Sequence, residues 1–286
     1  MSVTTKQSAF LLAALVVLIG VGYKASHRAV KTATVAMPTK SYVALGDSVA
    51  AGVGLKDESD SSACDRTKQS YPFIVAKTLN YNLTSLACSS ASLTEGVLGS
   101  QTVNQLALPA QLDALFALKA PDLITITIGA NDADWLQIIG KCYTGICGSA
   151  GDTAAVNARL AIVTTNLTAA LQRIKDHYGA HQPAVFVTGY YQVFPATTTT
   201  CTDLTGIDAS ELAWGRQQQA AISKAAKDAI PTSTLYRYVD IDFSGHELCT
   251  SDSWIQSIGD KQVYHPTQIG QAEMAKQIVL EAKSNQ

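Results

Sequence analysis

The feature that most restricts the fold of this chain is the alternation of short apolar runs with longer segments of helical periodicity. We predict strands at the apolar runs, which are Tyr42–Leu45, Leu83–Ala87, Leu123–Ile128, Ala184–Thr188 and Thr234–Val239. Helices are predicted between and after them, at Tyr71–Leu79, Leu108–Leu118, Thr153–His177, Ser210–Ala229 and Thr267–Ala282. Strands that are apolar throughout and separated by helices favour a parallel sheet covered on both faces. The chain is therefore predicted to form a single doubly wound, three-layer α/β/α domain.

The helical periodicity is clearest in the segment Thr153–His177. Apolar side chains recur there at steps of three and four residues, at Val156, Leu160, Val163, Leu167, Leu171 and Ile174. This spacing places them along one side of a helix, which we expect to face the sheet.

The N-terminal segment contains an uncharged apolar run, Ala9–Val21, preceded by Lys6. The run is shorter than the roughly 20 residues that span a bilayer and resembles a secretory signal. Basic residues follow the run at Lys24, Arg28 and Lys31, which leaves a retained short anchor open as the alternative. Residues 1–40 are therefore interpreted as a signal peptide or membrane anchor plus linker, and residues 41–286 as the folded domain.

All six cysteines lie after the apolar run: Cys64, Cys88, Cys142, Cys147, Cys201 and Cys249. An even number in an exported chain favours three disulfides, and six cysteines allow about 15 pairings, among which spacing does not choose. Zinc is the competing reading, but the chain has no C-x-x-C pair. We therefore expect disulfides and no metal site.

The charge balance bears on which partners the protein can have. The chain has 21 basic and 23 acidic residues and no basic run, which argues against nucleic acid as the main partner. It also lacks the glycine-rich motifs that bind dinucleotides or phosphate, so we expect no cofactor. The expected partner is a small-molecule or lipid ester, with membrane contact only through the N-terminal segment, and we expect a monomer.

Polar side chains follow the predicted strands where chemistry is expected. In doubly wound sheets, ligands bind at the carboxyl ends of the strands. Ser48 follows the first strand, where a strand-to-helix turn exposes its hydroxyl beside backbone N–H groups that favour an anion. Ser90 follows the second strand and Asn131 the third, while His265 precedes the last helix. A nucleophile, hydrogen-bond donors and a base at one edge of a sheet are what acyl transfer requires.

Four sequence blocks carry a more specific signal because they occur in a fixed order. They are YVALGDSVAAGVG, LACSSA, ITITIGANDADW and YHPTQIGQAEMA, and VTGYYQVFP and FSGHELCTSDSWI add to them. Together they resemble the SGNH/GDSL hydrolase family, and within it the secreted, disulfide-containing bacterial lipases and esterases. The resemblance runs from Ser41 to about Ala282.

The resemblance implies a flavodoxin-like order for a five-stranded parallel sheet. It also implies that Ser48 is the nucleophile and His265 the general base. The backbone N–H groups of Ser48 and Ser90 and the side chain of Asn131 would form the oxyanion hole. The disulfide pairs that it suggests are Cys64–Cys88, Cys142–Cys147 and Cys201–Cys249.

The chain departs from the family pattern at two positions. Ser90 stands where the second block usually has glycine, and a left-handed backbone there would cost a non-glycine residue about 1–3 kcal/mol. Gln262 stands three residues before His265, where the family usually carries its acid. We predict that the main-chain carbonyl of Gln262 accepts the imidazole Nδ1–H and orients the ring, with the Asp260 carboxylate as second choice.

The expected function is that of an extracytoplasmic, metal-independent serine esterase or lipase that hydrolyses carboxylic esters through an acyl-enzyme on Ser48. Trp135 and Tyr191 follow strand ends and would either line an acyl pocket or pack in the core. His246 is an alternative base. A carbohydrate O-deacetylase with the same residues and a broad polar groove is the alternative enzyme. Because of the two departures, a catalytically silent binding module is the alternative from another class.

Overall fold

The computed structural model describes residues 39–56, 63–197 and 201–284, and its centre is a parallel sheet of five strands. Their order is β2-β1-β5-β6-β7, and each neighbouring pair runs parallel. The strands are β1 Lys40–Gly46, β2 Tyr81–Ser85, β5 Leu123–Thr127, β6 Ala184–Thr188 and β7 Tyr236–Val239. This is the flavodoxin-like order and the doubly wound α/β class expected from the sequence, and both expectations are confirmed. The predicted N-terminal signal or anchor lies outside the described residues.

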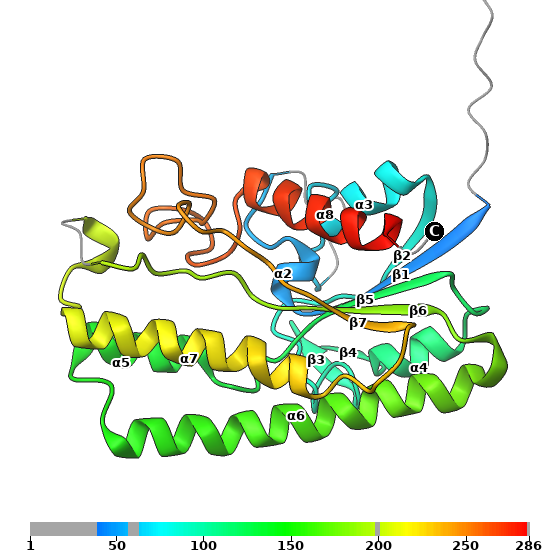
Figure 1. Ribbon diagram of the computed structural model, residues 1–286, viewed down its shortest axis with the longest axis horizontal. Coiled ribbons are helices and arrows are strands. Elements are labelled where there is room, and N and C mark those ends of the chain that lie inside the picture. Colours follow the sequence, from blue (N-terminus) through cyan, green and yellow to red (C-terminus); the bar gives the residue numbers. More distant parts are fainter. Residues whose placement is uncertain (1–38, 57–62, 198–200, 285–286) are drawn as a thin grey trace, which may run out of the picture. The chain divides into compact units, whose positions relative to one another are not determined.

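Helices cover both faces of the sheet, as Figure 1 shows. One face carries α3 (Tyr71–Leu79) and α8 (Gln268–Lys283), and the other carries α4 (Gln111–Phe116), α6 (Ala150–Tyr178) and α7 (Ala209–Asp228). The central strand β5 is buried along its whole length because both of its faces are covered. Among the described residues, we find no helix with the length and apolarity needed to cross a membrane.

Helix α6 shows how the sequence pattern becomes structure. Its N-terminus is closed by a capping box, in which the Ser149 side chain accepts the Asp152 N–H and the Asp152 carboxylate accepts the Ser149 N–H. The helix is longer than predicted at both ends, but the six apolar residues predicted to share one side are all buried. The predicted helical face is therefore confirmed.

A hairpin and a helix were not predicted. Strands β3 (Gln101–Val103) and β4 (Leu106–Leu108) form an antiparallel hairpin that shares only Leu108 with the predicted helix Leu108–Leu118, and the helix itself, α4, begins at Gln111. The two residues between them, Asn104 and Gln105, both have positive φ, which fits the tight turn of a two-residue hairpin. Helix α5 (Trp135–Thr144) begins four residues after the candidate residue Asn131.

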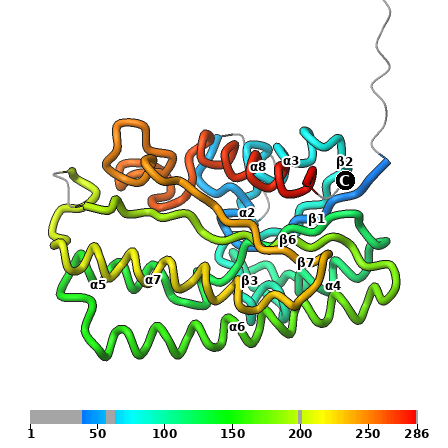
Figure 2. Tube along the Cα trace, in the orientation of Figure 1, coloured from blue at the N-terminus to red at the C-terminus, as the bar shows by residue number. Residues whose placement is uncertain are grey.

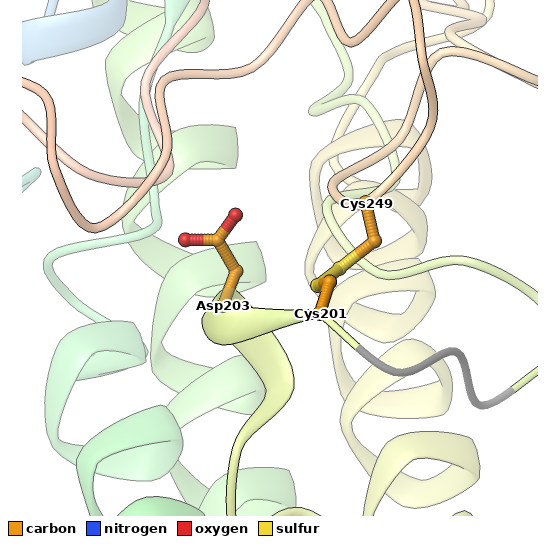
Figure 3. A group of neighbouring side chains, drawn as sticks. All are labelled: Cys201, Asp203 and Cys249. Atoms are coloured by element: carbon orange, nitrogen blue, oxygen red, sulfur yellow. A yellow bond between two sulfur atoms is a disulfide. The ribbon is translucent and has the colours of Figure 1, made fainter.

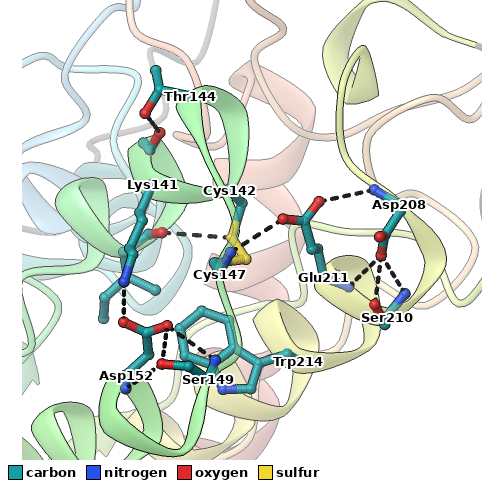
Figure 4. Close-up of a disulfide and its surroundings, with 12 residues drawn as sticks. Lys141, Cys142, Thr144, Cys147, Ser149, Asp152, Asp208, Ser210, Glu211 and Trp214 are labelled. Atoms are coloured by element: carbon teal, nitrogen blue, oxygen red, sulfur yellow. Dashed lines mark hydrogen bonds and ion pairs between the residues drawn. A yellow bond between two sulfur atoms is a disulfide. The ribbon is translucent and has the colours of Figure 1, made fainter.

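Disulfides join Cys64 to Cys88, Cys142 to Cys147 and Cys201 to Cys249, as the family resemblance implied. The second of these closes the segment between α5 and α6 (Figure 4). There the buried Glu211 carboxylate of α7 accepts the Cys147 backbone N–H at 3.1 Å, and Lys141 pairs with Asp152. Three helices are thereby connected around one disulfide.

The long connections after β6 and β7 run to the same end of the sheet as α5 (Figures 1 and 2). This is the carboxyl-terminal edge of the strands, since β1 leads at that edge into the short helix α2 (Ser48–Ala51). The strand topology and these loops thereby bring the segment after β1 and the segment before α8 to the same edge of the sheet.

Candidate active site

Ser48 is the first residue of α2 and directly follows β1. Asp47 caps this helix, with its carboxylate accepting the Val49 N–H at 2.9 Å. Gly46, before it, has φ +140°, and a Cβ there would lie 2.3 Å from the Thr127 carbonyl oxygen of β5. A tight turn that only glycine can make therefore presents the Ser48 hydroxyl at the edge of the sheet.

His265 lies beside the serine, although 217 residues separate the two in sequence. Its Nε2 is 2.7 Å from the Ser48 Oγ, which is hydrogen-bond distance for a nucleophile and its base. Burial lowers the pKa of His265, and the backbone carbonyls of Val263 and Gln262 oppose that shift. The imidazole is consequently held in the neutral form that can accept a proton near pH 7.

The Val263 carbonyl, next to the predicted one, lies nearest to the His265 ring, with its oxygen 3.1 Å from Nδ1. The predicted Gln262 carbonyl accepts the His265 backbone N–H at 3.4 Å and also raises the pKa of the imidazole, so it acts on the ring beside Val263. Tyr264 has φ +69°, and this turn brings the carbonyl two residues before the histidine, not three, to its ring. The second choice, Asp260, makes no hydrogen bond to the His265 ring among the described residues, and its carboxylate accepts the Ser257 N–H at 2.8 Å.

The predicted oxyanion donors line the same cavity as the dyad. Within the described part of the chain, the backbone N–H groups of Ser48 and Ser90 have no hydrogen-bond acceptor. Ser90 has φ +62°, so the left-handed backbone that glycine would take without strain is present here in a serine. The Asn131 side chain donates to the Ala91 carbonyl at 2.7 Å and keeps a second N–H. Three donors therefore lie around one cavity with Ser48 and His265.

The remainder of the cavity wall is mainly apolar. It includes the two aromatic residues singled out from the sequence, Trp135 and Tyr191, both of which are buried. Val193 and Ile222 are buried beside them, and Leu136 is exposed on the rim. The arrangement gives the serine an apolar chamber suited to an alkyl group.

Two acids stand next to the site, the buried Asp47 and the partly buried Asp132. Asp47 is 1% exposed, and this burial raises its pKa to about 7. Burial also raises the pKa of Asp132, whose two carboxylate oxygens accept the Leu93 N–H at 3.0 and 2.9 Å. Both acids hold backbone N–H groups at the edge of the site and are not in hydrogen-bond contact with Ser48 or His265.

The alternative base, His246, is placed elsewhere. Its ring stacks on Trp254 at a centroid distance of 3.6 Å, and its Nδ1 is 2.8 Å from the Asp252 carbonyl oxygen.

Sequence reasoning missed three further residues beside the site, Tyr190, Gln256 and Gln271. They bind main-chain atoms far away in sequence, so no local pattern marks them.

One group of potential metal-ligand side chains occurs among the described residues, Cys201, Asp203 and Cys249 (Figure 3). The two sulfurs form a disulfide, so neither is available as a thiolate. The Asp203 carboxylate accepts the Ile258 N–H at 2.7 Å. We therefore interpret this group as a structural connection between the loops after β6 and β7.

The chain was compared with known proteins. Residues 44–273 match the model of the GDSL-like lipase/acylhydrolase family. A lipase from Streptomyces rimosus is 30% identical over 248 residues, which are 81% of this chain and 82% of that protein. The crystal structure of phospholipase A1 from Streptomyces albidoflavus NA297 superimposes with a TM-score of 0.65 and 29% identity, covering 85% of this chain and 99% of that one.

A carbohydrate esterase of family 2 from Corynascus thermopiles (Myceliophthora fergusii), solved with a carbohydrate-binding domain, is also similar. Its TM-score is 0.50 at 17% identity, and the match covers 87% of this chain and 67% of that one. At this identity the similarity concerns the fold alone.

Proposed function

The chain belongs to the GDSL-like lipase/acylhydrolase family and is a carboxylic ester hydrolase, and on that premise we propose that Ser48 attacks its esters as a nucleophile activated by His265. The observation that carries the proposal is the 2.7 Å contact between His265 Nε2 and Ser48 Oγ, in the wall of a mainly apolar cavity. The free N–H groups of Ser48 and Ser90 support it further.

The proposed reaction has two steps. His265 takes the proton of Ser48 as the oxygen attacks the ester carbonyl, and the negative charge that develops is stabilised by Ser48 N–H, Ser90 N–H and the Asn131 amide. The imidazolium then gives its proton to the leaving alcohol, and an acyl-enzyme remains. Water activated by the same imidazole releases the acid. The Val263 carbonyl keeps the proton on Nδ1, so that Nε2 is free to act as the base.

The cavity wall favours an alkyl acyl group over an acetylated sugar. Trp135, Tyr191, Val193 and Ile222 offer apolar contact, whereas a polysaccharide deacetylase requires a broad polar groove. We therefore propose a lipase or esterase acting on lipid or other alkyl esters. The alternative activity, carbohydrate O-deacetylation, is supported only by the shared fold.

We propose an extracytoplasmic location. Three disulfides are typical of proteins from oxidising compartments, and a solved relative is described as an extracellular lipase from Streptomyces rimosus. Residues 1–40 would direct export as a signal peptide or tether the protein as an anchor, and residues 41–286 would work as a monomeric catalytic domain. Mass analysis of the secreted protein distinguishes a cleaved segment from a retained one.

The test is covalent labelling of the full-length chain with a fluorophosphonate, which needs no choice of ester. Wild type should gain one adduct, and Ser48→Ala should gain none while retaining its thermal unfolding temperature. Release of p-nitrophenol from esters of increasing acyl length, compared with release of acetate from acetylated xylan, then separates the two enzyme classes. A folded, oxidised wild-type protein without an adduct would instead favour the silent binding module.

A further inference from the structure

Tyr190 joins two parts of the site that are far apart in sequence. It lies two residues after β6, and its backbone is fixed by Ser223 of α7, which accepts the Tyr190 N–H at 3.0 Å and donates to its carbonyl at 3.1 Å. The phenol hydroxyl donates to the Asp47 carboxylate and accepts the Ala130 N–H at 3.1 Å. One hydroxyl therefore touches the residue before Ser48 and the residue before Asn131.

The contacts form a continuous path between the nucleophile and an oxyanion donor. The Asp47 carboxylate accepts the Val49 N–H with one oxygen and the Tyr190 hydroxyl with the other. Asp47 is 1% exposed, so its carboxylate depends mainly on protein donors for its hydrogen bonds.

Asn131 needs such a connection because it is exposed and lies in a loop. Its side-chain amide donates to the Ala91 carbonyl, and its main-chain carbonyl accepts the Asp134 N–H at 3.1 Å. Neither hydrogen bond fixes the distance between Asn131 and Ser48. An oxyanion donor is effective only at about 2.7–3.1 Å from the developing charge. A misplacement of about 1 Å costs on the order of 100-fold in rate.

We propose that Tyr190 is a positioning residue of the oxyanion hole, whose hydroxyl fixes Asn131 relative to Ser48 by binding Ala130 and Asp47 together. The inference rests on the proposed function, because it assigns Asn131 to the oxyanion. Tyr190 itself does not touch the reacting atoms in this arrangement.

Tyr190→Phe in the full-length protein tests the inference, because it keeps the ring and removes only the hydroxyl. On a p-nitrophenyl ester we expect kcat to fall about 10- to 100-fold, with KM changing less than about threefold. The affinity of an alkyl boronic acid, which forms a charged tetrahedral adduct on serine, should fall by the same factor as kcat/KM.

The matched control is Tyr178→Phe, which removes the hydroxyl of another buried tyrosine that donates to the Leu115 carbonyl at 3.2 Å and does not line the cavity. It should leave kcat and boronate affinity unchanged. A loss that comes only from weaker folding would affect both variants and would follow their unfolding temperatures.

A double-mutant cycle with Asn131→Ala makes the test specific. If Tyr190 acts through Asn131, adding Tyr190→Phe to Asn131→Ala should lower kcat less than about threefold. An undiminished loss in that background, or an unchanged kcat in Tyr190→Phe alone, overturns the inference. Wild type that takes no fluorophosphonate adduct would instead contradict the proposed function, so the two failures are distinguishable.

Discussion

The two members of the proposed dyad are positioned in different ways. Ser48 lies between the end of β1 and the start of α2, and β1 pairs with β2 on one side and β5 on the other. His265 lies in the connection between β7 and α8, where the regular pairing is an isolated bridge between Ile255 and Pro266. The nucleophile is thus held by the sheet, and the base by contacts made within and around a loop.

Gln256 is central to those contacts. Its backbone N–H donates to the His265 carbonyl at 2.8 Å, and its own carbonyl accepts the Tyr264 N–H at 2.9 Å. Its buried side chain donates to the carbonyls of Val53 and Pro266 at 3.2 and 3.1 Å. One glutamine therefore connects the loop that carries the base to the segment after α2.

This difference predicts how strongly the Ser48 half and the His265 half of the site respond to the loss of a supporting side chain. A parallel strand flanked by two others shares its position among many backbone bonds, so the loss of one side chain moves it little. A loop held by a few side chains moves when one of them is lost. Substitutions outside the site should therefore reduce activity mainly by displacing His265.

The largest effect is expected from removing either member of the dyad. Ser48→Ala and His265→Ala should each lower kcat about 10⁴-fold or more, and the double variant should be little worse, because the two residues act as a unit. Steady-state kinetics on a p-nitrophenyl ester provides the measurement. Asp260→Asn is the control, because a loss approaching 10⁴-fold there would restore the carboxylate as the group that orients the histidine.

The second effect compares a buried glutamine in each half. Gln256→Ala removes the connection of the base loop, and we expect kcat to fall about 10- to 100-fold. Gln271→Ala removes bonds to the Val49 carbonyl and the Tyr71 N–H on the nucleophile side, and kcat should fall less than about fivefold.

Both glutamine variants should lose about 1–3 kcal/mol of unfolding free energy, because each leaves buried backbone groups unpaired. Urea unfolding measured beside the kinetics separates stability from activity. Equal losses of kcat in the two variants would contradict the expectation that the loop of His265 is more sensitive than the strand end that carries Ser48.

A smaller effect is expected on the nucleophile side from the strained residue after β2. Ser90→Gly should raise the unfolding free energy by about 1 kcal/mol, because glycine takes a positive φ without steric cost, and kcat should change less than about threefold. Ser89→Gly is the matched control, since Ser89 is not a residue of positive φ, and it should lower stability by about 0.5–1 kcal/mol. Greater stability in both variants would mean that strain is not the cause.

The smallest effect concerns pH. The reaction needs a neutral imidazole, so kcat/KM should rise with pH as His265 loses its proton. Because burial lowers the pKa of His265, the midpoint should lie below 6.5, the ordinary value for histidine. A profile of kcat/KM from pH 4 to 9 measures it. A midpoint at or above 7 would mean that the site stabilises the charged ring.

The sequence predicted the sheet well because periodicity is a local signal. The strand β6 has the predicted bounds, and α6 buries the predicted side. The signal for α5 was present too, although no helix was predicted there: its buried residues recur at helical spacing, at Trp135, Ile138, Ile139 and Cys142.

The prediction was incomplete where one torsion or one distant bond decides the outcome. The Val263 carbonyl lies nearest to the His265 Nδ1 where Tyr264 takes a positive φ, and a tyrosine in a sequence gives no sign of such a conformation. Tyr190 and Gln256 act on backbone atoms that lie far from them in the chain, at separations of 60 and 203 residues. Such contacts leave no periodic trace, so only a three-dimensional arrangement reveals them.

The separation of 217 residues between Ser48 and His265 also matters while the protein is being made. At the usual rate of synthesis, the histidine joins the chain on the order of 10–40 s after the serine. During that interval the growing polypeptide contains Ser48 without the base proposed to activate it. The proposed pair becomes complete only when the segment after the last strand has been added, so the order of the residues along the chain would delay the onset of activity.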